Sequence, residues 1–255
     1  MIYSLDICHL YPNLLNTYGD YGNIIALKQR AFWRGIQVNV HNISINDNYQ
    51  YEKYDITFLG GGQNFEQEII QNDLIQNKGS SIKEAINAGY IFLAICGGYQ
   101  LLGEYYKLEN NTIHLLDAIN ICTIAENNRL VGDLAFYCDF LKSDTFDGII
   151  VGFENHSGRT FLGPHVKPLG KIIYGNGNNG TDGFEGAIFK NTFCSYSHGS
   201  LLPKNPEFTD YILSLALQRK YKDSITLSPL DNSLENNAKL YILNKLKLTP
   251  KRSKL

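Results

Sequence analysis

Hydrophobic positions follow two alternating periods along the first half of the chain. Short apolar runs rich in β-branched residues are separated by longer stretches with the period of an amphipathic helix, which is typical of βαβ units in a parallel sheet. The predicted strands are residues 2–9, 37–41, 55–59 and 90–95, and the predicted helices are 22–34, a segment that follows residue 64, and 82–88. The pattern predicts an α/β fold, a single three-layer domain with a mostly parallel central sheet.

The second half of the chain is less regular. Glycine and asparagine turns separate five predicted strands, and two helices follow. The strands are 131–138, 149–153, 171–174, 186–189 and 193–197, and the helices are 206–219 and 232–246. Composition becomes polar from Tyr221, and four basic residues lie in 247–255. We therefore expect a main domain over residues 1–220 and a C-terminal helical extension with a basic tail over 221–255.

Composition and charge exclude several classes of protein. The chain has 255 residues, of which 44% are hydrophobic and 19% are charged, so it can form a substantial core. Its 23 basic and 25 acidic side chains give a formal net charge of 23 − 25 = −2. The sequence has no basic patch of the kind that nucleic-acid binding needs. No apolar run is long enough to cross a membrane, and Asp6 interrupts the N-terminus where a signal peptide would be apolar. We expect a cytoplasmic protein that binds no nucleic acid.

The five cysteines are scattered singly, which indicates neither a disulfide framework nor a metal site. Cys96 is exceptional, because it lies between the apolar run 90–95 and the pair Gly97 and Gly98, before a helical pattern. A strand, a sharp turn and a helix start are what a nucleophile elbow requires. Free helix amides would favour a thiolate and could hold an oxyanion. Alternatively, Cys96 fills space in the core, or the glycines hold a phosphate.

A histidine that could serve as a general base follows another predicted strand. His198 lies next to Gly199, just beyond the strand 193–197. At the same edge of the sheet, it could take the thiol proton and return it to a leaving amine. His156 is the only serious rival among the six histidines, and we favour His198.

Several segments together carry a family resemblance. They are 93–103 (LAICGGYQLLG), 196–199 (YSHG), 16–23 (NTYGDYGN), 58–63 (FLGGGQ), 129–133 (RLVGD), 152–156 (GFENH) and 198–206 (HGSLLPKNP). With them the chain resembles the class I, triad-type glutamine amidotransferases, in the subgroup similar to cobyric acid synthase glutaminase domains. The likeness spans roughly the first 220 residues, so it is more specific than one motif. It implies a flavodoxin-like fold and hydrolysis of glutamine.

The resemblance also implies roles for individual residues. It makes Cys96 the nucleophile and His198 its base. The oxyanion donors would be the amides of Gly97 and of one of two glycines, Gly61 or its neighbour Gly62. Arg129 would anchor the α-carboxylate of glutamine, which a guanidinium can bind in a forked geometry. Gln100 would line the same pocket, and no metal is implied.

One departure from the wider class leaves a role unassigned. Most class I members carry a glutamate two residues after the histidine, and this chain has Ser200 there. Either His198 works in a dyad, or a distant carboxylate orients it. The candidates, which the sequence does not rank, are Glu154, Asp20 and Glu185.

The resemblance further implies a partner chain. No G-x-x-x-x-G-K-[ST] phosphate loop is present, and one α/β domain leaves no room for an ATP-dependent synthetase. Within the subgroup, the chain is similar to glutaminase subunits that form a heterodimer with a Mur-ligase-like subunit. That partner binds ATP and Mg²⁺ and amidates D-glutamate of lipid II to D-isoglutamine. This chain would need no cofactor, and its partner would hold it near the inner face of the membrane. The alternatives are a glutaminase for cobalamin-type amidation, a stand-alone cysteine hydrolase, and a non-catalytic flavodoxin-like binding module.

Overall fold

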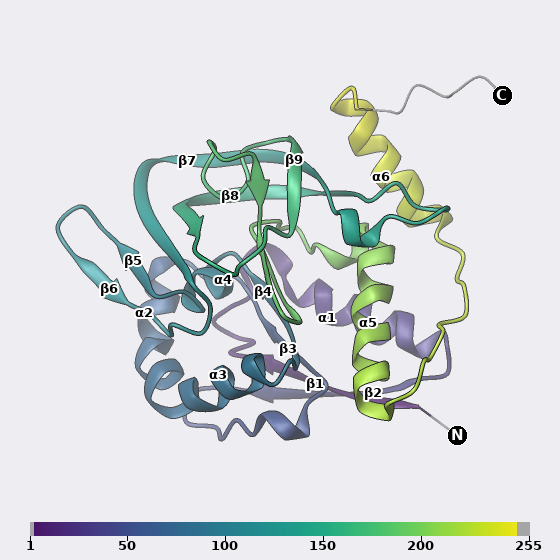
Figure 1. The fold of residues 1–255 in the computed structure, drawn as a ribbon, viewed down its shortest axis with the longest axis horizontal. Helices are drawn as coiled ribbons and strands as arrows, with labels where there is room; N and C mark the ends of the chain where they lie inside the picture. The colour runs from purple at the N-terminus through teal and green to yellow at the C-terminus, as the bar shows by residue number, and fades with distance from the viewer. Residues whose placement is uncertain (1–2, 249–255) are drawn as a thin grey trace.

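The computed structural model of the protein describes residues 3–248, and its centre is a six-stranded sheet (Figure 1). In sheet order, the strands are β11 (Ala187–Phe189), β12 (Thr192–Ser195), β4 (Ile91–Ile95), β3 (Ile56–Leu59), β1 (Ser4–Leu10) and β2 (Gln37–Ile43). All neighbouring pairs are parallel except the edge pair β11–β12. The predicted mostly parallel sheet is therefore confirmed.

Helices cover both faces of this sheet. They are α1 (Tyr21–Phe32), α2 (Asn64–Asn72), α3 (Gly79–Asn87), α4 (Gly97–Leu101) and α5 (Pro206–Tyr221), whereas α6 (Ser233–Lys245) packs elsewhere, as described below. A π-helix, η3 (Asp73–Lys78), joins α2 to α3, and the short 3₁₀ turns are η1 (Thr17–Gly19), η2 (Tyr51–Lys53), η4 (Asp139–Leu141) and η5 (Leu202–Lys204). Sheet and helices together form the three layers that the sequence predicts.

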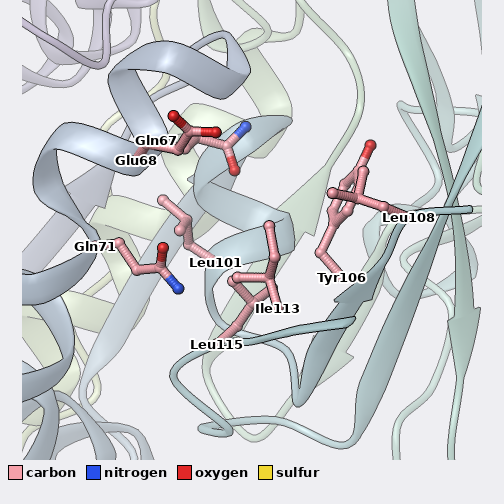
Figure 2. Close-up of a pocket in the computed structure, with 8 residues that line it drawn as sticks. All are labelled: Gln67, Glu68, Gln71, Leu101, Tyr106, Leu108, Ile113 and Leu115. Atoms are coloured by element: carbon pink, nitrogen blue, oxygen red, sulfur yellow. The ribbon is translucent and has the colours of Figure 1, made fainter. Parts of the chain in front are cut away.

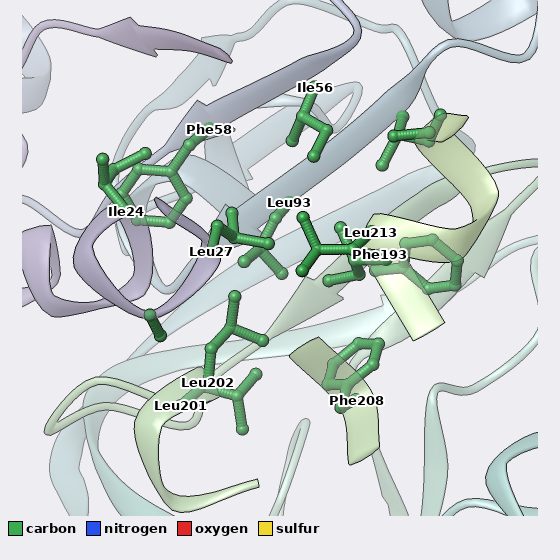
Figure 3. Close-up of a cluster of buried hydrophobic side chains, with 14 of the residues drawn as sticks. Ile24, Leu27, Ile56, Phe58, Leu93, Phe193, Leu201, Leu202, Phe208 and Leu213 are labelled. Carbon is green, nitrogen blue, oxygen red and sulfur yellow. The ribbon is translucent and has the colours of Figure 1, made fainter. Parts of the chain in front are cut away.

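Alternation along the strands explains the two helical layers. Leu93 of β4 points into the cluster that contains Leu27 of α1 and Leu213 of α5, as Figure 3 shows. Its neighbour Phe92 belongs to the opposite cluster, which contains Ile82 of α3. All of these side chains are fully buried, and each contributes about 2 kcal/mol of hydrophobic stabilisation relative to exposure. A strand that is apolar at every position is thus buried on both faces.

Residues 105–185 contain the strands of a separate, mainly antiparallel sheet. Its strands are β10 (Phe184–Glu185), β9 (Gly170–Tyr174), β7 (Ile121–Tyr137), β8 (Ile149–Leu162), β5 (Tyr105–Lys107) and β6 (Thr112–His114). The pairing of β7 with β8 shifts in register between Ala125 and Leu130. The backbone N–H of His198 donates to Phe153 O of β8 at 2.6 Å, so this ribbon adjoins the carboxyl end of β12.

The C-terminal extension packs on the main domain. Leu243 of α6 is buried with Ala135 and Val151 of the second sheet. The side chains of Lys239 and Lys245 pair with Glu207 and Asp133, respectively. The helix predicted at 232–246 is therefore present, whereas the predicted tail lies, from residue 249 on, outside the described residues. The boundary at residue 220 stays a prediction. Within residues 3–248, no helix combines the length and apolar character needed to span a bilayer.

The carboxylate of Asp210 is shared by two arginines with buried side chains, one of which also pairs with Glu235 at 3.6 Å. The Asp210 carboxylate accepts hydrogen bonds from Arg30 and Arg34, both at 2.7 Å, and each arginine side chain is only 4% exposed. Removal of the Asp210 carboxylate would take this anion away from two guanidinium groups that are largely shielded from water. We expect Asp210→Ala to lower the free energy of unfolding by about 3 kcal/mol, measured by urea denaturation. An exposed carboxylate such as Asp144 should tolerate the same change, and equal losses in both variants would contradict this account.

Candidate active site

Cys96 occupies a sharp turn between β4 and α4. Its backbone angles are φ 47° and ψ −102°, which lie outside the regions favoured by non-glycine residues. Its N–H donates to Ser195 O at 2.8 Å, which ties the turn to β12. A Cβ on Gly97 would lie 2.7 Å from Gly62 O, so glycine is required for this close approach. Strain of this kind is typical of nucleophile turns. Cys96 is partly exposed and is not sealed in the core.

His198 follows β12 and lies beside Cys96. Burial lowers its pKa, but the nearby Cys96 sulfur and the Asp20 carboxylate oppose this effect and raise the pKa to about 10. Both ring nitrogens are buried, and neither makes a hydrogen bond of good geometry with any residue in 3–248. Long or imperfect catalytic hydrogen bonds are common before substrate binds. The raised pKa favours the imidazolium form of His198.

Asp20, immediately before α1, is the carboxylate that faces His198. Its Oδ1 lies 3.5 Å from His198 Nδ1, and both side chains are fully buried. The other two candidates are engaged elsewhere. Glu154 accepts hydrogen bonds from the backbone N–H groups of Asn176 and Gly177, and Glu185 accepts from Ser195 Oγ and the Tyr196 N–H. The structure thus ranks Asp20 first among carboxylates that the sequence left unranked.

The backbone amides around the sulfur favour Gly62 over the predicted Gly61. The N–H of Gly61 donates to Asp20 Oδ2 at 2.7 Å, so it is already occupied. No residue in the described part of the chain accepts a hydrogen bond from the N–H of Gly62 or Gly97. A Cβ on Gly97 would also lie only 2.8 Å from Gly62 N, so the two residues are in close contact. Gly97 and Gly62 are therefore the pair available for an oxyanion, and Asp20 explains why Gly61 is not.

The structure also brings Arg129 and Gln100 to the same pocket. Arg129 lies where β7 and β8 shift in register, and its side chain is exposed at the pocket wall. Gln100 of α4 is buried, and its amide donates to Tyr196 Oη at 3.0 Å and accepts from Gln67 at 3.3 Å. Gln100 therefore shapes the pocket as predicted, although its amide is engaged by the protein. The pocket has a volume of about 390 Å³, and Cys96 and His198 line it too.

His156, the rival base, lines the same pocket, but its ring is engaged by other residues. Its Nδ1 lies 2.7 Å from Gly158 O, and its ring stacks on Tyr196 with a centroid distance of 3.6 Å. Sequence reasoning missed two neighbours, Tyr18 and Asn155, which line the pocket between Arg129 and His198. Both belong to segments that carried the family resemblance. The sequence therefore marked the segments that contain Tyr18 and Asn155, but only the fold shows that these two side chains line the pocket.

A smaller pocket of about 50 Å³ adjoins the pocket that contains Cys96. It lies between α2, α4 and the β5–β6 hairpin, where Leu101, Ile113 and Leu115 converge (Figure 2). Gln67 and Tyr106 line both pockets. The lining of the smaller pocket carries no cation that could bind an α-carboxylate. An amino-acid substrate therefore fits the larger pocket, which has Arg129.

Comparison with known proteins gives the family. Residues 6–206 match the family described as CobB/CobQ-like glutamine amidotransferase domain. This match covers more than half of the chain, and the chain belongs to that family. The predicted class, a class I glutamine amidotransferase of the cobyric-acid-synthase-like subgroup, is confirmed, and the reading as a non-catalytic binding module is set aside.

Two relatives are similar in sequence over most of the chain, and one solved structure is similar in fold. The chain is 44% identical over 234 residues to the lipid II isoglutaminyl synthase (glutamine-hydrolyzing) subunit GatD of Streptococcus pneumoniae, covering 91% of this chain and 88% of that protein. It is 42% identical over 247 residues to the same subunit of Staphylococcus aureus, covering 96% and 97%. A chain of the PurLQS structure from Thermotoga maritima has a TM-score of 0.56 at 12% identity, covers 87% of this chain and 100% of that one, and supports the fold alone.

Proposed function

We propose that the chain is the glutaminase subunit of a two-subunit enzyme. It hydrolyses L-glutamine through a cysteine thioester and supplies ammonia to a Mur-ligase-like partner, which amidates D-glutamate of lipid II to D-isoglutamine. The observation that carries the chemistry is Cys96 on its strained turn, in one pocket with His198 and Arg129. The acceptor is supported by 42–44% identity to subunits named for lipid II, over nearly their whole length.

Thioester formation uses the charges already present in the pocket. The Cys96 thiolate attacks the side-chain amide carbon of glutamine, and the carbonyl oxygen becomes an oxyanion held by the Gly97 and Gly62 amides. The carbon–nitrogen bond then breaks as the His198 imidazolium gives its proton to the leaving nitrogen. Ammonia and a γ-glutamyl thioester result, and His198 is left neutral.

Hydrolysis of the thioester follows from the loss of charge on sulfur. The Cys96 thiolate is one of the groups that raise the pKa of His198, and it no longer exists in the thioester. Neutral His198 can then take a proton from water, whose oxygen attacks the thioester carbon. Glutamate leaves as the carbon–sulfur bond breaks, and the starting thiolate and imidazolium are restored. Asp20 orients the ring in both steps.

The synthetase half of the reaction belongs to the partner. Ammonia must attack an activated carboxyl group, and we place ATP, Mg²⁺ and acyl-phosphate formation on the Mur-ligase-like subunit. The glutaminase would then act in the cytoplasm, close to the inner membrane face through that partner. Both subunits should co-purify as a heterodimer when they are co-expressed.

The proposal is tested with the co-purified complex. We expect ATP-dependent amidation of lipid II with glutamine as the nitrogen donor, detected as a loss of about 1 Da per stem peptide by mass spectrometry. A chain that purifies alone in the presence of a full Mur-ligase-like candidate would contradict the partner. If the chain instead associates with an ATP-grasp or P-loop synthetase that amidates a corrinoid, the proposed lipid II acceptor is wrong and the proposed glutaminase activity stands.

The pKa of His198 predicts the alkaline limit of glutamine hydrolysis. Because the pKa is raised from 6.5 to about 10, the imidazolium that protonates the leaving nitrogen persists until the pH approaches 10. The same shift stabilises the fold fully below pH 6.5, and this stabilisation is lost as pH rises through about 10. We expect kcat/KM to fall only near pH 10 in a profile from pH 6 to 11. A fall centred near pH 6.5 as pH increases would contradict this assignment.

A further inference from the structure

Asn155, on β8, connects the pocket wall to the catalytic histidine. Its Oδ1 accepts a hydrogen bond from Arg129 Nε at 2.8 Å, and its backbone oxygen accepts one from Arg129 Nη2 at 3.1 Å. Its Nδ2 donates a hydrogen bond to the hydroxyl of Tyr18. All three residues line the pocket that contains Cys96. Neither Asn155 nor Tyr18 takes part in the reaction steps above.

These hydrogen bonds fix the plane and the free edge of the Arg129 guanidinium. Asn155 binds the edge formed by Nε and Nη2. Nη1 has no hydrogen-bond partner among residues 3–248, so the edge formed by Nη1 and Nη2 stays available. Two parallel N–H groups on one edge are the geometry that binds a carboxylate in bidentate fashion. Without Asn155, the exposed Arg129 side chain would be free to sample many rotamers.

Tyr18 in turn fixes the orientation of Asn155. Arg129 offers only donors, so the Asn155 amide must turn its oxygen toward Arg129 and its nitrogen toward an acceptor, which is the Tyr18 hydroxyl. Tyr18 itself has φ 58°, a costly conformation for an aromatic residue. Its ring packs edge-on against His198, with a centroid distance of 5.1 Å. A strained residue held at this position is consistent with a role in the pocket.

We infer that Asn155 and Tyr18 are positioning residues that give the pocket its specificity for an α-carboxylate, because together they hold Arg129 with one guanidinium edge open. The inference rests on the proposed function, since it takes Cys96 as the nucleophile and Arg129 as the carboxylate anchor. The substrate class is an amino acid with a free α-carboxylate. Arg129 held in this way should not help to bind or orient an amide that lacks an α-carboxylate.

Two electrophiles test the inference in the full chain. The first, 6-diazo-5-oxo-L-norleucine, resembles glutamine and carries the α-carboxylate, whereas iodoacetamide carries none. The rate of alkylation at Cys96 is followed by peptide mass analysis for each reagent. We expect Asn155→Ala and Asn155→Asp to slow the diazo reagent by about 10- to 100-fold, because a displaced or neutralised guanidinium no longer orients it. The iodoacetamide rate should stay within about twofold in both variants.

Reference variants separate the possible failures. Arg129→Lys should slow the reaction with the diazo reagent alone, and Tyr18→Phe should do so more weakly. Asn127→Ala, at an exposed position on the same strand as Arg129, should change neither rate. If the diazo reagent does not label Cys96 in the unsubstituted chain, the proposed function is overturned. If the diazo reagent alkylates Cys96 more slowly in Arg129→Lys but not in one of the Asn155 variants, only the present inference is overturned. Equal slowing of both reagents in the Asn155 variants indicates general damage to the pocket and also overturns it.

Discussion

Replacement of Cys96 by alanine is expected to lower kcat for glutamine hydrolysis by about a million-fold, as in other enzymes that lose a catalytic nucleophile. The sulfur forms the only covalent bond to substrate in the proposed reaction, and no other cysteine lines the pocket. Ammonia release from glutamine is the direct measurement. In the complex with its partner, free ammonium should still support amidation, because the substitution leaves the synthetase intact.

Cys122 provides the matched control for this experiment. It is a half-buried cysteine on β7, outside the residues that line the catalytic pocket. Cys122→Ala should retain activity within about twofold, since it removes a sulfur of similar exposure that contacts no reacting atom. If Cys96→Ala continues to release ammonia from glutamine, the cysteine mechanism is wrong. A parallel loss of ammonium-dependent amidation in Cys96→Ala would instead indicate a damaged interface.

Much of the central sheet was predictable from local pattern alone. The strand predicted at 90–95 is β4 at Ile91–Ile95, and the helix predicted at 206–219 is α5 at Pro206–Tyr221. Each of these elements has a continuous period and a clear stop signal, and neighbours in a parallel sheet are joined by short-range βαβ units. The hydrophobic period was therefore sufficient to predict these strands and helices and their arrangement in layers.

The second sheet could not be assembled in the same way. The strand predicted to begin at residue 131 is β7, which begins at Ile121 and continues through the exposed polar residues 126–129. A strand with a solvated stretch in its middle has no continuous hydrophobic alternation to mark it. Its pairing with β8 and the bridge between Phe153 and His198 join distant parts of the chain. Periodicity contains no information on such pairings.

The proposed nucleophile and base could be chosen from the sequence, but their surroundings depended on the fold. Cys96 and His198 each carry a local signature, a turn of small residues and a strand end. The choice among three carboxylates required three-dimensional proximity, which only Asp20 satisfies. The same residue decides the oxyanion donor, because its second oxygen occupies the Gly61 amide. The position of this one buried carboxylate thus favours an answer to each of two questions that the sequence left open.

Substitution of Asp20 by asparagine is expected to reduce kcat by about 1,000- to 10,000-fold with a much smaller change in KM, as for the corresponding change in a serine-protease triad. In the Asp20→Asn variant, the amide oxygen of the new side chain could still accept the hydrogen bond from Gly61. The amide nitrogen would then face His198 Nδ1 and favour the ring tautomer with the proton on Nε2. That tautomer cannot accept a proton from water, so thioester hydrolysis should be affected most.

The pH profile distinguishes this role of Asp20 from a purely structural one. The Asp20 carboxylate is among the groups that raise the pKa of His198, so its removal should move the alkaline limit of kcat/KM below pH 10. Burst experiments should show accumulation of the thioester, because its hydrolysis would become slower than its formation. A variant that loses activity only in proportion to its folded fraction, with an unchanged alkaline limit and no accumulated thioester, would show that Asp20 supports the fold and does not orient His198.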